Sequence, residues 1–469
     1  MAENNYDLVI IGAGSGGLTA AGFAAQLGAR VAIVEKSRIG GDCTWTGCVP
    51  SKALLKAAKV AHEVRTACHY GITSGPPVTD MAKVRNYVLA AIHQVYQFES
   101  PEELQQKGID VLLGAARFIS ATSIEVADRI VQSKKFLITT GAQAVLPQIA
   151  GLSEVPFLTY EKIFENDRLP NRLIVIGGGP IGSELAQAYQ RFGSQVTIVA
   201  DRILPKEDLD VRELIGRVFE REGLRLLTGR AKSVRNDGDG IVVSTDGEEV
   251  RGDMLLVASG RRPTVEGLDL EKAGVTYSKK GILVDEHLRT NVKNIYAAGD
   301  VIGGQQFTHF AGWQAFQAVR NALLPARTSG FTGLVPRVTF TDPEVAQVGP
   351  TEEQARSKYG NNVKVCYTKM SHVDRAVCEN DRDGFIKVIA KSDGTLLGAT
   401  IVAGRAGESL SELIVAIKQN LKVADLAGAI HAYPTYSSGI QQLAADMIIE
   451  KLLTGISGRI VRGLSKIIR

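Results

Sequence analysis

Two cysteines stand close together near the start of the chain, in the stretch GGDCTWTGCVPSK. Cys43 and Cys48 are separated by four residues, and Pro50 follows at the start of a run with apolar residues at helical spacing. We therefore expect Cys48 at the amino end of a helix. The helix dipole and the nearby Lys52 favour a thiolate there, which is typical of a reactive cysteine.

Two other interpretations of the pair remain open at this point. The cysteines are either ordinary reduced thiols or half of a metal site. Metal sites usually have closer cysteine pairs and further Cys or His ligands, and none follow locally. Five cysteines in 469 residues do not make a disulfide scaffold, so a Cys43–Cys48 bridge is expected to be catalytic rather than structural.

Length and composition limit the class of protein. A chain of 469 residues is expected to form roughly two to four domains. The net charge of +4, without a run of Lys or Arg, does not favour a nucleic-acid partner. The apolar run Leu8–Ile11 is too short for a membrane span and lacks the basic start of a signal peptide. We expect a cytoplasmic protein without an integral membrane segment.

The first elements of the chain follow a dinucleotide-binding pattern. A strand-like run to Ile11, a glycine-rich turn, a small-residue helix and a second strand closed by Glu35 follow one another. In this GxGxxG fingerprint Gly12 makes the turn, Gly14 admits the pyrophosphate and Gly17 lets the helix pack on the sheet. Glu35 is expected to accept hydrogen bonds from the ribose hydroxyls.

The same pattern begins again at Leu173. A strand, a second GxGxxG formed by Gly177, Gly179 and Gly182, a helix and another strand follow in order. This internal repeat of a strand–helix–strand unit predicts two dinucleotide-binding domains in one α/β chain.

The second strand of the repeat ends in Ala200-Asp201-Arg202. No acid stands at the position that matches Glu35. Asp201 is suited to a free ribose 2′-hydroxyl, whereas Arg202 is suited to a 2′-phosphate. The sequence therefore leaves NADH and NADPH equally open.

The rest of the chain contains helices beside the first domain and a separate C-terminal domain. Helical periodicity runs from Met81 to Gln106, and we expect a helical excursion there. After Pro336, four strand-like runs precede two helical runs, which predicts an antiparallel sheet followed by helices. The loop 430–438 holds two tyrosines and a histidine, and the sequence alone favours a packing or interface turn. The last twelve residues, GRIVRGLSKIIR, are basic and amphipathic.

Together these features resemble the flavoprotein disulfide reductases, a family that includes glutathione reductase, dihydrolipoamide dehydrogenase and mercuric reductase. The resemblance extends from Tyr6 to about Ile449. It implies an α/β fold with two Rossmann-like domains and a C-terminal α+β dimerisation domain, and hence a homodimer. The implied boundaries are 1–147 with 264–334 for the FAD domain, 148–263 for the NAD(P) domain and 335–469 for the dimerisation domain.

The resemblance also implies roles for individual residues. Cys48 is the thiolate beside the flavin of FAD, and Cys43 is the sulfur that meets the substrate. Lys52 and Glu184 match the family's lysine–glutamate pair next to the flavin. The expected contacts with FAD and with NADPH or NADH are Gly12, Gly14, Gly17, Glu35, Gly41, Thr140, Gly141, Gly177, Gly179, Gly182, Asp201, Arg202, Gly260, Asp300 and His309. His309 opens a helix and is expected there as a helix-start residue rather than a catalyst.

One loop departs from the thiol–disulfide members of the family. They carry a histidine where this chain has Tyr433 and a glutamate where it has Ser438. That pair protonates a leaving thiol, and general acid–base help of this kind contributes typically ~10²–10⁴ in rate. His431 stands two residues too early. Tyr433 instead resembles mercuric reductase, in which a tyrosine at this position helps to bind the metal.

These observations support three hypotheses. The leading one is an NAD(P)H-dependent FAD enzyme of mercuric-reductase type, with a redox-active Cys43–Cys48 disulfide and a soft metal ion or another small acceptor, and without a resident metal. The alternative enzyme is a dihydrolipoamide dehydrogenase or another disulfide reductase that uses Tyr433 or His431. A flavin-binding redox sensor with little turnover belongs to a different class, and the complete CxxxxC motif with both fingerprints argues against it.

Overall fold

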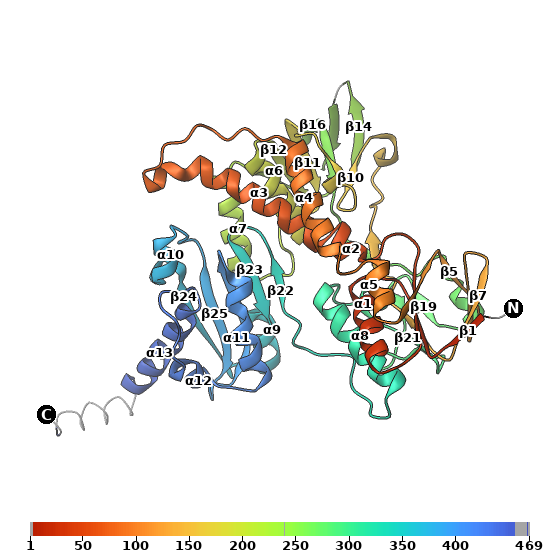
Figure 1. The fold of residues 1–469 in the computed structure, drawn as a ribbon. Coiled ribbons are helices and arrows are strands. Elements are labelled where there is room, and N and C mark those ends of the chain that lie inside the picture. Colours follow the sequence, from red (N-terminus) through yellow and green to blue (C-terminus); the bar gives the residue numbers. More distant parts are fainter. Residues whose placement is uncertain (1–2, 239, 455–466, 468–469) are drawn as a thin grey trace. The chain divides into compact units, whose positions relative to one another are not determined.

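The computed structural model describes residues 3–238, 240–454 and 467. The chain divides into two compact units (Figure 1). The first comprises Met1–Arg202 and Gly223–Thr332, and the second comprises Ile203–Glu222 and Gly333–Arg469. The expected α/β fold with a separate C-terminal α+β domain is confirmed by the parallel sheets of the first unit and the antiparallel sheet of the second.

The first dinucleotide unit is a five-stranded parallel sheet with the order β21-β8-β2-β3-β4. Every residue of β2 (Leu8–Ile11) and β3 (Val31–Glu35) is buried, which explains why their sequences are continuous apolar runs rather than alternating ones. Helix α1 (Ser15–Gln26) connects them. The other strands are β4 (Ile109–Leu113), β8 (Phe136–Ile138) and β21 (Ile295–Ala297).

Helix α8 (Thr308–Leu323) returns to this sheet and packs against α1. Their contact is built from small residues, because Ala20 and Ala24 of α1 share a buried cluster with Ala315 and Ala318 of α8. Side chains of this size let two helices approach closely. The packing fixes the amino end of α8, where Thr308 lies.

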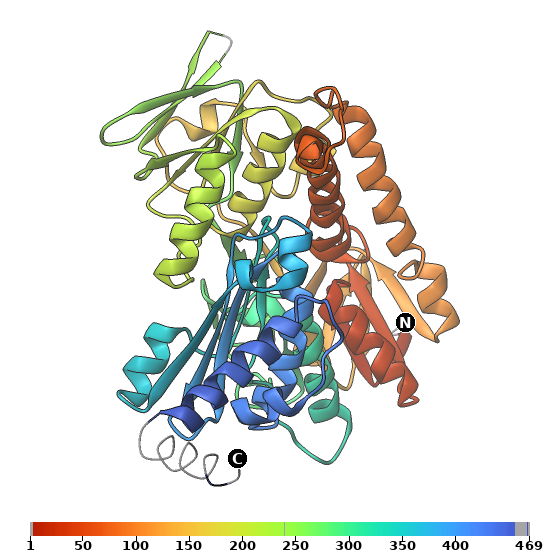
Figure 2. The same ribbon diagram turned by 90° about the vertical axis from the view of Figure 1, so that its left-hand side faces the viewer.

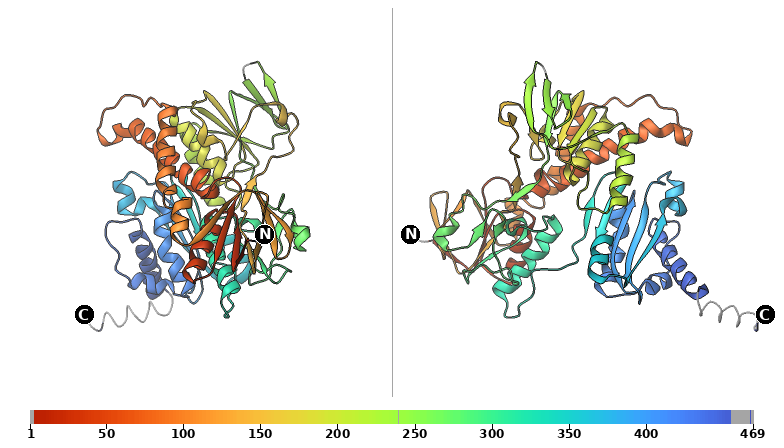
Figure 3. Two further views of the ribbon diagram at one scale, coloured as in Figure 1. Left: turned by 45° about the vertical axis from the view of Figure 1, so that its right-hand side comes forward. Right: turned by 180° about the vertical axis from the view of Figure 1, so that it is seen from behind.

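The cysteine region is helical. Cys43 lies in the short helix α2 (Gly41–Trp45) and Cys48 begins α3 (Cys48–Thr66). Helix α4 (Met81–Tyr96) packs along α3, and α5 (Pro101–Gln106) follows (Figure 3). The expected helical excursion is therefore present.

The second dinucleotide-binding domain, which also belongs to the first compact unit, repeats the topology of the first. Its parallel sheet has the order β10-β17-β11-β12-β13, and α6 (Pro180–Phe192) connects β11 to β12. A separate three-stranded antiparallel sheet, β14-β15-β16, belongs to the same part of the chain (Figure 3). The strands are β10 (Leu158–Thr159), β11 (Arg172–Ile176), β12 (Gln195–Ala200), β13 (Arg225–Thr228), β14 (Ser233–Asp237), β15 (Gly240–Ser244), β16 (Glu249–Gly252) and β17 (Met254–Val257).

Smaller sheets complete the first unit. One has the order β1-β7-β6-β5, and two strand pairs, β9 with β18 and β19 with β20, are antiparallel. Their bounds are β1 (Glu3–Tyr6), β5 (Ala116–Ser120), β6 (Ser123–Val126), β7 (Arg129–Ser133), β9 (Ala142–Ala144), β18 (Arg261–Pro263), β19 (Tyr277–Ser278) and β20 (Gly281–Ile282).

The second unit is built on a five-stranded antiparallel sheet, β22-β23-β26-β25-β24. The first of the four expected runs contains two strands, which pair antiparallel on either side of a turn that includes Pro343. Helices α11 and α13 lie against the sheet (Figure 2). Leu410 and Leu413 of α11 and Ile440 of α13 belong to the buried cluster that they form with it. The elements are β22 (Arg337–Thr339), β23 (Glu344–Val348), α9 (Glu352–Tyr359), β24 (Val363–Lys369), α10 (Asp374–Cys378), β25 (Phe385–Lys391), β26 (Leu396–Ala403), α11 (Ala406–Lys418), α12 (Val423–Gly428) and α13 (Ser438–Leu453).

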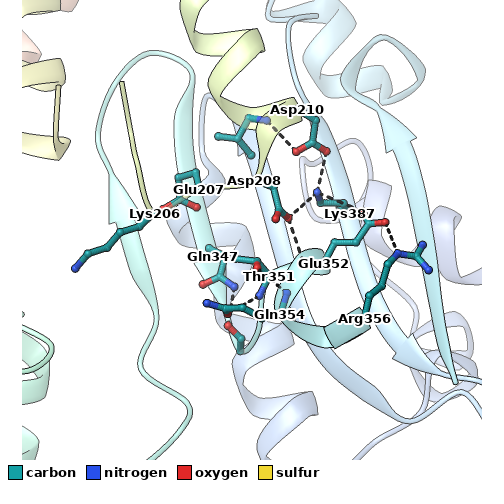
Figure 4. Close-up of polar contacts among 12 residues, drawn as sticks. Lys206, Glu207, Asp208, Asp210, Gln347, Thr351, Glu352, Gln354, Arg356 and Lys387 are labelled. Atoms are coloured by element: carbon teal, nitrogen blue, oxygen red, sulfur yellow. Dashed lines mark hydrogen bonds and ion pairs between the residues drawn. The ribbon is translucent and has the colours of Figure 1, made fainter. Parts of the chain in front are cut away.

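Helix α7 (Leu209–Arg221) groups with this second unit, although its sequence lies between β12 and β13. The reason is a buried lysine (Figure 4). Lys387 of β25, whose side chain is only 2% exposed, lies 2.8 Å from carboxylate oxygens of both Asp208 and Asp210. A buried ammonium group requires such partners. The sequence did not predict this grouping, because it assigned 203–222 to the NAD(P) domain; that boundary stays a prediction.

In the part of the chain that the structure describes, no helix is both long enough and apolar enough to cross a bilayer. The basic tail lies outside the described residues, except for Ile467.

Candidate active site

A tight turn brings the two cysteines together. Gly47 separates α2 from α3, and a methyl group at this position would lie 2.8 Å from the carbonyl oxygen of Asp42. Glycine is therefore required where the chain folds back between the two helices. Cys43 and Cys48 are free thiols in the structure, and each lies within the other's hydrogen-bonding environment.

The surroundings of the two sulfur atoms make them unequal. The pKa of Cys48 is lowered to about 6, first by a hydrogen bond from the Cys43 thiol and further by Thr308 and by the charge of Lys52. The pKa of Cys43 is raised by the same hydrogen bond and by burial. The Thr308 hydroxyl oxygen lies 3.1 Å from Cys48 Sγ. This geometry favours Cys48 as the thiolate, as the helix position predicted.

Lys52 and Glu184 meet as expected. Lys52 lies one turn after Cys48 on α3, and its ammonium nitrogen is 3.0 Å from Glu184 Oε2 on α6. Glu184 is buried, so its carboxylate is stabilised by the paired charge. The positive charge of Lys52 helps to lower the pKa of Cys48, and the negative charge of Glu184 partly opposes this effect.

The first glycine fingerprint fits a dinucleotide. Gly12 has a φ of +103°, and a methyl group on Gly17 would lie 1.9 Å from the Gly12 carbonyl oxygen, so helix and turn are in direct contact. A methyl group on Gly14 would instead make only an ordinary van der Waals contact, 3.9 Å from the Cα atom of Gly41. The backbone at Gly14 is therefore accessible to a pyrophosphate at the amino end of α1. Gly41 closes the same space, with a φ of +57°.

Glu35 and Asp300 lie at the carboxyl ends of their strands or just beyond, as expected. Glu35 is buried, and its carboxylate accepts hydrogen bonds from the backbone N–H groups of Ala13 and Ser37, both at 2.8 Å. Asp300 is also buried, and burial raises its pKa although the neighbouring Arg261 opposes the shift. Both carboxylates are thus held in place for ligand hydroxyls, and the residues present fit the adenine dinucleotide FAD.

Other expected FAD contacts have structural roles in the same region. The Thr140 hydroxyl donates to the Thr264 carbonyl at 2.7 Å, and Gly141 has a φ of +71°. His309 lies in the first turn of α8 as a helix-start residue, and its ring stacks on Phe307. The neighbouring Thr308 contacts Cys48 through its hydroxyl group.

The second fingerprint repeats the geometry of the first. Gly177 has a φ of +118°, and a methyl group on Gly182 would lie 2.0 Å from the Gly177 carbonyl oxygen. Gly179 has nothing within contact distance of a methyl group, so its backbone is also accessible to a pyrophosphate. Gly260, with a φ of +127°, follows the neighbouring strand β17. Beside them, Asp201 pairs with Arg230.

Arg261 is a site residue that sequence reasoning missed. Its guanidinium group lies 2.6 Å from the Asp42 carboxylate and 2.9 Å from that of Asp300. The Tyr160 hydroxyl also donates to Asp42 at 3.2 Å. Arg261 therefore connects the residue before Cys43 to the acid expected at the flavin. An arginine following Gly260 was the available signal, but its partners are distant in sequence.

Thr308 was missed for a similar reason. The sequence predicted a helix start at the neighbouring His309, and nothing local connects Thr308 to a cysteine 260 residues away. The only signal for Thr308 in the sequence was its hydroxyl group in the first turn of a helix that returns to a nucleotide-binding sheet.

The loop between α12 and α13 lies in the second compact unit, which contains the C-terminal antiparallel sheet. The Tyr433 side chain is 72% exposed, and its hydroxyl donates to Asp374 at 2.5 Å. The His431 side chain is 8% exposed, with Nε2 at 2.7 Å from Glu412 Oε2 and Nδ1–H donating to the Ala429 carbonyl. The Ser438 hydroxyl donates to the Thr435 carbonyl at 2.7 Å. None of these contacts reproduces an imidazole oriented by a carboxylate at 433 and 438.

Comparison with known proteins adds independent information. Residues 6–315 match the family described as pyridine nucleotide-disulphide oxidoreductase, and residues 335–444 match its dimerisation domain. The mercuric reductase of Staphylococcus aureus is 35% identical over 461 residues, which cover 96% of this chain and 84% of that protein. The dihydrolipoyl dehydrogenase of Thermus scotoductus is 36% identical over 450 residues, covering 94% and 96%.

A solved structure is also similar. The HOCl-induced flavoprotein disulfide reductase RclA from Escherichia coli has a TM-score of 0.86 and 30% identity, and the match covers 94% of this chain and 99% of that one.

Proposed function

The chain belongs to the pyridine nucleotide-disulphide oxidoreductases, flavin-dependent enzymes that use FAD and NAD(P)H, and on this premise we propose that it passes electrons to a soft metal ion such as Hg²⁺ or Cu²⁺. The observation that carries the proposal is the environment of the loop 431–438. It offers an exposed tyrosine and no proton-donating histidine at position 433.

The chemistry requires two electrons and two sulfur atoms. Bound FAD supplies two-electron transfer between the nicotinamide and the disulfide. Cys48, with its lowered pKa, is the thiolate that the cofactor side needs, and Cys43 is the thiol that meets the acceptor. Thiolates are preferred ligands of soft metal ions. One NAD(P)H, which is oxidised to NAD(P)⁺ with release of H⁺, reduces one Hg²⁺ to Hg⁰ or two Cu²⁺ to two Cu⁺.

A disulfide substrate would need a proton for its departing thiolate, and this loop is poorly suited to give one. The hydrogen bond to the Asp374 carboxylate raises the pKa of Tyr433, so the phenol is a weaker acid than usual. His431 is buried against Glu412 and the Ala429 carbonyl, which occupy both ring nitrogens. A metal ion needs ligands rather than a proton, so this arrangement does not impede its reduction.

The relatives support the same acceptor class. Several similar proteins are mercuric reductases, and a Cu(II) complex of the Escherichia coli protein RclA has been solved. Dihydrolipoyl dehydrogenases are also among the relatives. The acceptor screen described below therefore includes lipoamide, which tests the alternative function of a disulfide reductase.

The matched dimerisation domain supports a homodimer. We propose further that residues 431–438 of one subunit face the partner's Cys43, which places Tyr433 beside the acceptor. Light scattering at micromolar concentration tests the assembly, and a monomer contradicts it.

The experiment is an NAD(P)H-oxidation screen of the purified FAD-loaded protein against Hg²⁺, Cu²⁺, lipoamide, glutathione disulfide and quinones. We expect turnover with a metal ion, loss of that turnover in Cys43→Ser, and slow turnover of both disulfides. Lipoamide or glutathione disulfide reduction faster than that of every metal ion overturns the proposal in favour of a disulfide reductase. Equal metal-dependent rates in the wild type and in Cys43→Ser also overturn it.

A further inference from the structure

Cys43 lies in a short helix that is fixed on both sides of the cysteine. Helix α2 has only five residues, which is too few for a helix to be stable through its own backbone hydrogen bonds. Contacts with other segments must therefore hold it in place. Asp42 and Thr44, the residues directly before and after Cys43, both make such contacts through their side chains.

The contact of Thr44 is enclosed. Thr44 is 1% exposed, and its hydroxyl group donates a hydrogen bond to Glu99 Oε2 at 2.8 Å. Glu99 lies between α4 and α5, and its carboxylate is so close to the start of α2 that a methyl group on Gly40 would lie 2.7 Å from the same oxygen. Hydrogen bonds to a charged acceptor are stronger than those between neutral groups. Thr44 is therefore firmly held by a residue 55 positions away.

Asp42 is held by a different part of the chain. The guanidinium group of Arg261 lies 2.6 Å from Asp42 Oδ2, and the Tyr160 hydroxyl donates to the same oxygen at 3.2 Å. The Asp42 carbonyl accepts the N–H of Thr46 at 2.9 Å, and its carboxylate accepts the Thr46 hydroxyl at 3.3 Å. Both ends of α2 are thus connected to Asp42.

These anchors limit how far the Cys43 sulfur can move. With the residues on both sides held, the sulfur moves mainly by rotation about the Cα–Cβ bond of Cys43. Even as a free thiol it stays within hydrogen-bonding reach of Cys48. A thiol that is already held beside its partner forms a disulfide more readily, because less conformational entropy is lost on closure.

We propose that Thr44 and Asp42 are positioning residues for the cysteine pair. Through Glu99 and Arg261 they hold α2 so that Cys43 stays beside Cys48, and they thereby shift the equilibrium between dithiol and disulfide towards the disulfide. The inference rests on the redox use of the pair in the proposed function, but it is independent of the electron acceptor.

The equilibrium is defined by exchange with a small dithiol. Reduction breaks the Cys43–Cys48 bond, and the two sulfur atoms take up two electrons from the dithiol, which is oxidised to its cyclic disulfide. The protons of the dithiol pass to the protein sulfur atoms or to water. Positions 42 and 44 take no part in these bond changes and act only through the place of Cys43.

The equilibrium is measured on the FAD-loaded protein without nicotinamide or acceptor. The protein is equilibrated anaerobically in mixtures of reduced and oxidised dithiothreitol, quenched with acid and labelled with N-ethylmaleimide. Mass spectrometry of the peptide that holds Cys43 and Cys48 counts the labels, so the labelling of Cys68, Cys366 and Cys378 does not interfere.

Thr44→Val removes the hydroxyl donor at nearly constant volume, and Glu99→Ala removes its acceptor. Each should lower the equilibrium constant for disulfide formation by roughly threefold to tenfold, which raises the midpoint potential by about 15–30 mV for a two-electron couple. The double variant should shift the constant no further than either single variant, because both remove one contact. Glu99→Gln keeps an acceptor oxygen and should match the wild type.

The second anchor is tested separately. Asp42→Ala, which releases α2 from Arg261, should lower the equilibrium constant as Thr44→Val does. Combining Asp42→Ala with Thr44→Val should lower it further, because two separate anchors are then lost.

Ser100→Ala is the matched control for a loss of stability without a loss of positioning. Ser100 follows Glu99 and caps α5 by accepting the N–H of Glu103 at 3.3 Å. Removal of this cap should lower the melting temperature. It should leave the equilibrium constant of the cysteine pair unchanged, because Ser100 is not an anchor of α2.

Two results overturn the proposal: an unchanged equilibrium constant in folded Thr44→Val, or the same shift in Ser100→Ala as in Thr44→Val. If Thr44→Val does not fold, Glu99→Ala and Glu99→Gln decide, and equal constants in these two variants overturn the proposal. Because no acceptor is present, failure of the metal-ion proposal leaves these outcomes intact.

Discussion

The sulfur of Cys48 lies 3.1 Å from the hydroxyl oxygen of Thr308, so the first residues of two helices, α3 and α8, meet at the reactive thiol. A hydroxyl group that donates to a sulfur anion stabilises it, and Thr308 contributes in this way to the lowered pKa of Cys48. The contact depends on the packing of α8 against α1, although α8 begins 260 residues after Cys48 in the sequence.

Replacing Thr308 with Val removes that donor at nearly constant volume. We expect the pKa of Cys48 to rise from about 6 by roughly one unit, as the loss of a hydrogen bond to a charged group predicts. The rate of Cys48 alkylation by iodoacetamide, followed from pH 4 to 9 in the reduced protein, gives the pKa. Below the pKa this rate should fall roughly tenfold per pH unit, because only the thiolate reacts.

The control for this variant is Thr66→Val, at the other end of α3, where the hydroxyl donates to the His62 carbonyl. It should leave the alkylation profile unchanged. An unaltered Cys48 profile in Thr308→Val would show that Cys43 and Lys52 alone set the pKa.

The protein should purify yellow, and Gly14→Val should make it colourless without unfolding it. A β-carbon at Gly14 would make only a van der Waals contact with the Cα atom of Gly41, at 3.9 Å, so the fold is expected to tolerate the change. The same side chain occupies the place of the pyrophosphate. The ratio of flavin absorbance to protein absorbance, together with circular dichroism, measures both effects.

Gly22→Ala on the same helix is the matched control, since an added methyl group has nothing within 4 Å. It should retain FAD and raise the free energy of unfolding by about 0.5–1 kcal/mol, the usual difference between Gly and Ala inside a helix. A correctly folded wild-type protein that takes up no FAD contradicts the assignment of the first dinucleotide-binding domain as the FAD site.

The two cysteines should be distinguishable by absorbance. Reduction by two electrons should produce a long-wavelength charge-transfer band, because the Cys48 thiolate is the one favoured by its surroundings. Cys48→Ser should abolish the band, and Cys43→Ser should retain it. The reverse result would mean that the roles of the two sulfur atoms are exchanged.

The double variant Tyr433→His with Ser438→Glu should gain disulfide reductase activity. Tyr433 is exposed and Ser438 begins α13, where a carboxylate is favoured by the helix dipole, so the fold should accept both changes. An imidazole oriented by a carboxylate protonates a departing thiolate. Turnover of lipoamide or glutathione disulfide should rise by roughly one to two orders of magnitude.

Turnover of a metal ion should not rise with it, because that step requires no proton donor. Tyr433→His alone is the comparison that separates the imidazole from its orienting carboxylate. If the wild type already reduces lipoamide at a rate limited only by its oxidation of NAD(P)H, the interpretation of Tyr433 is wrong.

The sequence by itself determined the elements whose causes are local. The glycine turns around Gly12 and Gly177 need conformations or close approaches that other residues cannot adopt, so their types reveal their roles. The helix that begins at Cys48 follows from Pro50 and the apolar spacing, and it already predicted the lower pKa of that cysteine. The meeting of Lys52 with Glu184 came from the family resemblance, and the structure places the two 3.0 Å apart.

Only the tertiary structure decided the contacts between residues far apart in the chain. Thr308 reaches Cys48 because α8 packs on α1, and the Arg261 side chain joins Asp42 to Asp300. Helix α7 groups with the C-terminal sheet because the buried Lys387 requires its carboxylates. Such contacts depend on which surfaces are buried together, and no residue type or local spacing encodes the identity of a partner that is distant in the sequence.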